Sequence, residues 1–180
     1  MRQILDRTYS AALTLAATAF AAIGILVLVQ VTGRLIDRAA RAMGAAPPGI
    51  TVPSLAEIGG FLFLGAVFLG LAGTFTAGGH VRVTLLTRVL PDAPRRALGV
   101  AVAAGAAGLC AFATWSSLLQ FLDSVKFTSV SYGMVKIPLA IPQGVMTLGL
   151  ALLLLAILDA MVVLARGNTP AYEAAEEETG

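Results

Sequence analysis

Four long apolar stretches restrict the fold of this chain more than any other feature. They cover residues 8–31, 54–76, 97–122 and 138–164. Each has at least the roughly 20 residues that an α-helix needs to cross about 30 Å of hydrocarbon. Backbone amides in lipid need partners within the protein, and a helix supplies them within one segment. The sequence therefore predicts an all-α integral membrane protein with four transmembrane helices.

Composition supports the membrane class and argues against several functions. Hydrophobic residues make up 58% of the chain and charged residues only 12%, about half the charged share of a soluble domain. No cluster of basic and aromatic residues suggests nucleic-acid binding. Cys110 is the only cysteine and His80 the only histidine, too few for a disulfide, a His/Cys zinc site or a haem held by two histidines. We expect no cofactor, no metal and no enzymatic activity.

The first stretch resembles a signal peptide at its start but is too long for one. A basic beginning is followed by Ala17-Thr18-Ala19, which would suit a cleavage site. The apolar run continues to Val31, well past the 7–15 residues of a signal-peptide core. We therefore expect this segment to be retained as a membrane helix.

The residues between the first two stretches form an amphipathic pattern. The charged positions 34, 37, 38 and 41 share one helical face, and apolar residues lie largely on the other. Gly44 and Pro47-Pro48 end the pattern. We favour a short amphipathic helix in the membrane interface; an extension of the first transmembrane helix into water is the alternative.

The second stretch begins with a helix-capping pattern. Ser54-Leu55-Ala56-Glu57 has the spacing of a capping box, in which the hydroxyl and the carboxylate accept from free N–H groups at the helix start. This structural role is the first interpretation of Glu57. A salt bridge to a partner or a lipid head group is the second.

The loop after the second stretch carries basic side chains. It reads Gly79-His80-Val81-Arg82-Val83, and its basic residues are expected to meet anionic lipid head groups. A lone histidine at this place is predicted to form hydrogen bonds within the loop, in preference to binding a metal or relaying protons.

Two further residues stand out within the spans. Trp115 lies in the middle of the third, so it is predicted to pack in the bundle or against a partner. Asp159 is the only ionisable residue within a span and clear of its ends. Such a residue costs about 2.5–3.5 kcal/mol at a helix centre and less near an end, where Arg166 is expected to reach it. A structural or partner-pairing role is preferred.

Small residues predict where helices approach closely. They form one stripe in the second stretch and another in the third: Gly59, Ala66, Gly70 and Gly73, then Gly99, Ala103, Ala107 and Ala111. Packing within the bundle is their first interpretation. A second surface that docks onto another membrane protein is also expected.

The chain divides into a membrane domain, residues 1–166, and an acidic tail, residues 167–180, which is predicted to be disordered. Four spans place both termini on one side. That side carries slightly more Lys and Arg, which places both termini in the cytoplasm.

Several motifs, in order, resemble one family. They are Glu57 at the start of the second helix, the Gly79–Val83 loop, and Ser131-Tyr132-Gly133 leading into Ile137-Pro138 and Ile141-Pro142-Gln143. Together with the four helices, they resemble the small, Q-type membrane subunit of tripartite ATP-independent periplasmic (TRAP) transporters.

This resemblance implies a division of labour in a bacterial inner membrane. A large polytopic subunit would carry the substrate and sodium sites, and a periplasmic binding protein would deliver an organic anion, typically a carboxylate. The small subunit would brace the large one, lie among membrane lipids and contribute to docking the binding protein. Candidate contact residues are Glu57, Gly79, His80, Arg82, Trp115, Pro138, Pro142 and Asp159.

The alternative is a homo-oligomeric transporter or channel that works without a large subunit. It needs a polar path through the membrane. Neutral polar residues of the third stretch could line one: Thr114, Ser116, Ser117 and Gln120.

Overall fold

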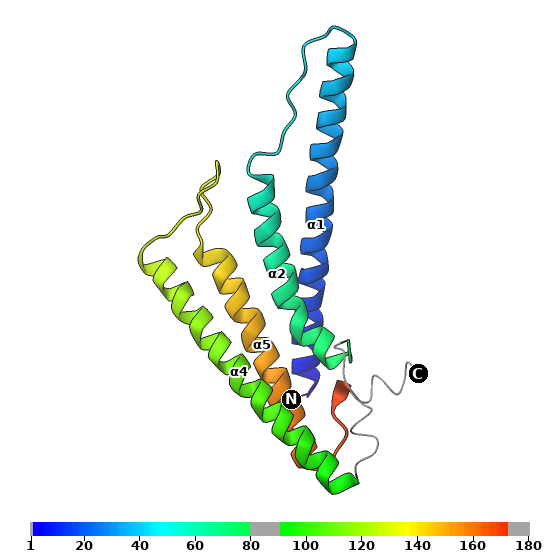
Figure 1. Cartoon of the computed structure of the whole chain (residues 1–180), viewed down its shortest axis with the longest axis vertical. Helices are drawn as coiled ribbons and strands as arrows, with labels where there is room; N and C mark the ends of the chain where they lie inside the picture. Colours follow the sequence, from blue (N-terminus) through cyan, green and yellow to red (C-terminus); the bar gives the residue numbers. More distant parts are fainter. Residues whose placement is uncertain (1, 80–90, 173–180) are drawn as a thin grey trace.

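The computed structural model describes residues 2–79 and 91–172, and these ranges fold into four helices (Figure 1). They are α1 (Arg2–Ala42), α2 (Leu55–Thr76), α4 (Asp92–Lys126) and α5 (Ala140–Ala165). All four are long and apolar enough to cross a membrane. The predicted all-α architecture with four membrane-spanning helices is confirmed.

The helices pack in the spatial order α1, α2, α5, α4. The main contacts join α1 to α2, α2 to α5, and α5 to α4. In the view of Figure 1, the N-terminus lies at one end of the bundle and the α1–α2 and α4–α5 connections lie at the other.

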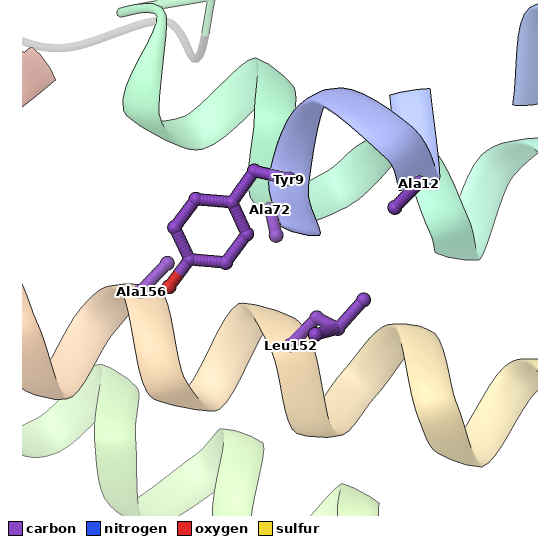
Figure 2. Packing of buried hydrophobic residues seen from close by; sticks show 5 residues of the cluster. All are labelled: Tyr9, Ala12, Ala72, Leu152 and Ala156. Carbon is purple, nitrogen blue, oxygen red and sulfur yellow. The ribbon is translucent and has the colours of Figure 1, made fainter. Parts of the chain in front are cut away.

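A small buried cluster joins three helices near the end that carries the N-terminus. Tyr9 and Ala12 of α1 meet Ala72 of α2 and Leu152 and Ala156 of α5, and Figure 2 shows the Tyr9 ring reaching from α1 toward Ala156. Three of these five side chains are alanines. The helices therefore approach closely here, as small residues in membrane helices allow.

The predicted small-residue stripes only partly coincide with helix contacts. In α2, Ala66 is buried, and a Cβ at Gly73 would lie 3.4 Å from the Cβ of Leu13 on α1. Gly59 has open space around it. In α4, Ala107 is buried but Ala111 is exposed. The prediction of close helix contact at these stripes is therefore correct in the N-terminal half of α4 and in the C-terminal half of α2.

The prediction of a separate interfacial helix between the first two spans is wrong. Helix α1 continues without a break for 41 residues, about 60 Å at 1.5 Å per residue. Within residues 32–43 the weakest helix former is Gly33, at about 1 kcal/mol relative to alanine, and most of the other residues are good helix formers. The helix ends just before Gly44, which has a φ of 73°. The extension of the first helix is thus the correct alternative.

The linker from α1 to α2 packs back along this extension. The Gly49 N–H donates to Asp37 Oδ1 at 2.9 Å, and the Val52 N–H donates to Gln30 Oε1 at 2.7 Å. The backbone of Ile50 lies so close to Gly33 that a Cβ there would collide with its carbonyl. One side of the extension is therefore covered by the linker.

The chain turns back after α5. Gly167 has a φ of 80°, and Arg96 Nε of α4 donates to the Leu164 carbonyl at 3.0 Å. Pro170 is fully buried, and the Tyr172 ring lies 5.4 Å from that of Phe75. The first residues of the predicted acidic tail are thus packed against the bundle, while residues 173–180 lie outside the described residues.

Candidate functional site

The connection between α4 and α5 forms a compact hairpin loop, residues 129–139. The Ser131 N–H donates to the Ile137 carbonyl, and the Leu139 N–H to the Ser129 carbonyl, both at 2.9 Å. The Ser131 hydroxyl donates to the Val135 carbonyl and accepts from the Ile137 N–H, both at 3.1 Å. Ser131 is only 3% exposed. Internal hydrogen bonds therefore fix the shape of this loop.

Two side chains of the α2 start hold the hairpin loop. The Gly133 N–H donates to Glu57 Oε1 at 3.1 Å, and the Val135 N–H donates to Ser54 Oγ at 3.0 Å. These bonds cross more than seventy residues of sequence. They make the N-terminus of α2 and the hairpin loop a single structural unit.

The predicted capping box is wrong, because the side chains of Ser54 and Glu57 bind the hairpin loop and not the start of their own helix. Ser54 has a left-handed backbone, with φ 53°, and its side chain makes no capping hydrogen bond. The Ser54 carbonyl accepts from the N–H groups of Glu57 and Ile58 instead. Both polar side chains are therefore free to turn away from their own helix toward the loop.

The contact at Glu57 is tight. A Cβ added at Gly133 would overlap the Glu57 carboxylate, so any larger residue must move the loop or the side chain. Among the described residues, Glu57 Oε2 is buried and has no hydrogen-bond partner. An unpaired buried polar atom costs about 1–3 kcal/mol, so a donor from outside this part of the chain would stabilise the carboxylate.

The tip of the hairpin loop presents large side chains outward. Tyr132 is 99% exposed and Met134 is 88% exposed, and Lys136 is exposed beside them. The loop lies at the end of the bundle remote from the N-terminus (Figure 1). Exposed aromatic and methionine side chains on a fixed loop are typical of protein contact surfaces.

Three of the residues predicted as contacts gather at this end. Glu57 binds the loop, Pro138 forms an isolated β-bridge with Val130 within it, and Pro142 is buried in the first turn of α5. Sequence reasoning missed Ser54 as an anchor, and Tyr132 and Met134 as exposed tip residues. The glycine inside Ser131-Tyr132-Gly133 was the available signal, because it marks a close backbone approach.

The other predicted contacts lie elsewhere. Trp115 is 60% exposed on α4, so it is not packed within the bundle, and its contact with a partner stays a prediction. Asp159 is half-buried on α5 and lies near enough to Tyr9 to act on it electrostatically. The Gly79 N–H donates to the Thr74 carbonyl at 2.8 Å, just after α2. His80 and Arg82 lie outside the described residues.

The expected approach of Arg166 to Asp159 is not seen. No ion pair forms between them in the described part of the chain, because Asp159 lies nearly two turns before Arg166, which follows the end of α5.

Two of the four polar residues considered for a pore form hydrogen bonds within the bundle. Ser117 is buried and shares a 2.7 Å hydrogen bond with Thr147 of α5, and Thr114 donates to the Cys110 carbonyl of its own helix at 2.7 Å. Ser116 and Gln120 are exposed. Of the four candidates, Ser117 thus joins two helices and Thr114 bonds only to its own helix.

The comparisons with known proteins gave one match. The family model described as "Tripartite ATP-independent periplasmic transporters, DctQ component" matches residues 23–167. This range includes the second half of α1, all of the other three helices, and the hairpin loop. No significant match was found among curated proteins or among solved structures.

Proposed function

The chain belongs to the DctQ component family of the tripartite ATP-independent periplasmic transporters, and we propose that it braces the large membrane subunit of such a transporter and helps to dock the periplasmic binding protein. The family match, which covers the second half of α1 and all of α2, α4 and α5, carries this proposal. The chain is a small permease subunit, one component of three.

The bracing role is supported by the large apolar surface of α4. Leu109, Phe112 and Trp115 are 75%, 71% and 60% exposed, and they lie on one side of the helix because they follow helical spacing. An aromatic-rich apolar face suits close packing against another membrane protein. It offers no ionisable group to a solute.

The docking role is supported by the hairpin loop. Its internal hydrogen bonds and its two anchors on α2 fix the direction of Tyr132 and Met134. A fixed loop loses little conformational entropy on binding, so its contacts contribute more fully to affinity. We place this surface on the periplasmic side, with both termini in the cytoplasm and the bundle in the bacterial inner membrane.

The complete transporter is proposed to import organic anions, typically carboxylates, driven by a sodium gradient. The substrate and sodium sites would belong to the large subunit. In this scheme the small chain contributes positioning and docking, which agrees with its few ionisable residues within the spans.

Reconstitution tests this division of labour. Proteoliposomes that contain this chain with the large subunit, supplied with binding protein and a sodium gradient, are expected to accumulate a carboxylate substrate. Vesicles with this chain alone are expected to show no uptake. Uptake by this chain alone, without the large subunit, would contradict the proposal.

The alternative, a homo-oligomeric transporter or channel, is favoured by one observation. Ser116 and Gln120 of α4 are exposed, so copies of α4 that face one another could place them along a polar path. The same vesicles distinguish the two functions, because the alternative requires uptake or conductance from this chain alone.

A further inference from the structure

Three arginines form a row on the α1 extension. Arg34, Arg38 and Arg41 are all exposed, and their spacing of four and three residues places them on one face of the helix. The row lies at the end of the bundle remote from the N-terminus (Figure 1). It therefore concentrates positive charge at one edge of the molecule.

The nearest acidic side chain does not neutralise this row. Asp37 is only 8% exposed, and its Oδ1 accepts from the Gly49 N–H at 2.9 Å. No ion pair joins it to any of the three arginines in the described ranges. Asp37 instead accepts a hydrogen bond from the linker, and the three exposed guanidinium groups have no ion-pair partner among the described residues.

The other side of the same helix is apolar, and Leu35 borders the arginine row. Ile25 and Leu28 are 62% and 66% exposed in the span, and Leu35, Ile36 and Met43 are 57%, 43% and 77% exposed in the extension. The apolar face thus continues past the first arginine by more than two turns. In water this surface would be unfavourable, whereas lipid at the membrane boundary would cover it.

We propose that this arginine row binds the phosphate groups of anionic phospholipids at the membrane surface remote from the chain termini. A guanidinium group donates two parallel hydrogen bonds to a phosphate, and it tolerates partial burial better than an ammonium group does. The long arginine side chains can reach the head groups while the neighbouring apolar side chains contact the acyl chains. This inference does not depend on the transport function.

A lipid is a better occupant than an acidic protein surface because of the apolar neighbours. The lipid-facing surface of the span and the apolar side of the extension are continuous. A soluble anionic protein would bind the arginines but leave Leu35 and Met43 in water. A phospholipid supplies both the charge and the apolar contact.

Brominated lipids test the proposal on the full chain. Trp115 is the only tryptophan, so the double substitution Trp115→Phe and Leu35→Trp places a single fluorescent reporter beside the row. In vesicles, quenching by brominated phosphatidylglycerol is compared with quenching by brominated phosphatidylcholine. We expect an association ratio of at least about five in favour of the anionic lipid, the factor expected from one arginine at an anionic surface.

Neutralising variants with a matched control complete the experiment. In the reporter background, R34Q/R38Q is expected to lower the ratio of association with phosphatidylglycerol to association with phosphatidylcholine toward one. K126Q/K136Q removes two charges at the same end of the bundle and should leave it unchanged.

Equal quenching by both lipids in the reporter chain would overturn the proposal, even if the R34Q/R38Q variant failed to fold. Absence of quenching by either lipid would overturn it too. A third contrary result is an unchanged lipid ratio in R34Q/R38Q combined with weaker attachment of the periplasmic binding protein. That result would assign the row to protein docking.

Discussion

Gly133 lies where the hairpin loop comes closest to α2, and it offers the most local test of that contact. Its φ is outside the left-handed region, so alanine is conformationally allowed there, and the collision of its Cβ with the Glu57 carboxylate and the Ser54 hydroxyl opposes it. We expect Gly133→Ala to displace the loop at about 1–3 kcal/mol, the usual cost of overpacking. In reconstituted transport, the concentration of binding protein that gives half the maximal rate should rise.

Gly24→Ala on α1, away from the hairpin loop and from the exposed face of α4, is the control for this substitution. A Cβ at Gly24 meets nothing within 4 Å, and alanine favours a helix over glycine by up to about 1 kcal/mol. Its transport should match that of the parent. If Gly133→Ala also left the dependence on binding protein unchanged, the loop would not be part of the docking surface.

Hydrogen exchange can measure separately how Ser54 and Glu57, the two anchors at the start of α2, hold the hairpin loop. Glu57→Ala removes the acceptor of the Gly133 N–H, and Ser54→Ala removes that of the Val135 N–H. A hydrogen bond contributes about 1 kcal/mol, so each amide should exchange about five-fold faster in its own variant. The Ile137 amide, bound to Ser131 inside the loop, serves as the internal reference, and equal acceleration of all three amides would contradict separate anchoring.

At Ser54 and Glu57 the sequence identified the right residues but the wrong partners. A capping box is a pattern within four residues, and it assumes that the serine backbone is extended. The left-handed Ser54 and the distant loop residues that its side chain binds depend on the tertiary fold. Local spacing carries no information about either of them.

At the scale of helices, the contact between α2 and α5 depends on one glycine. A Cβ at Gly149 would collide with the backbone of Phe68 on α2, and backbone atoms cannot move aside as a flexible side chain would. Gly149→Ala is therefore expected to destabilise the bundle by about 1–3 kcal/mol. Thermal unfolding in detergent measures this effect.

The matched control is Gly105→Ala on α4. Gly105 is also within a helix, but a Cβ there meets nothing within 4 Å. It should leave the unfolding temperature equal or slightly higher. A similar loss of stability in both variants would indicate a general effect of helix glycines and would refute the close α2–α5 contact.

The four spans were predictable, because apolar length alone requires helices in lipid. The course of residues 34–42 was harder to predict. An amphipathic pattern suits both a separate interfacial helix and an extension whose one side is covered. Asp37 and Gln30, which bind the returning linker, decide between them, and these contacts connect residues that sequence periodicity does not relate.

For the whole molecule, the spatial order of the helices could not be derived from periodicity. The exposed faces of α1 and α4 are as apolar as the buried ones, so hydrophobicity does not distinguish a side that meets lipid or a partner from one that meets the bundle. The positions of small residues mark the side that meets the bundle in part, as at Ala66 and Gly73. Ser131-Tyr132-Gly133 was singled out only as part of the family resemblance, and neither the hairpin shape of the loop nor its attachment to α2 was predicted.

The orientation of the molecule in the membrane can be tested because the two ends of the bundle are far apart. The N-terminal end of α1 lies opposite the hairpin loop (Figure 1). Arg7 is in the second turn of α1, and both residues to be labelled, Arg7 and Tyr132, are exposed. In a Cys110→Ala background, which removes the only thiol, Tyr132→Cys is expected to react with a membrane-impermeant maleimide in intact spheroplasts. Arg7→Cys should react only after the membrane is permeabilised, since the side with more Lys and Arg faces the cytoplasm. The reverse labelling pattern would place the hairpin loop in the cytoplasm, where it could not meet a periplasmic binding protein.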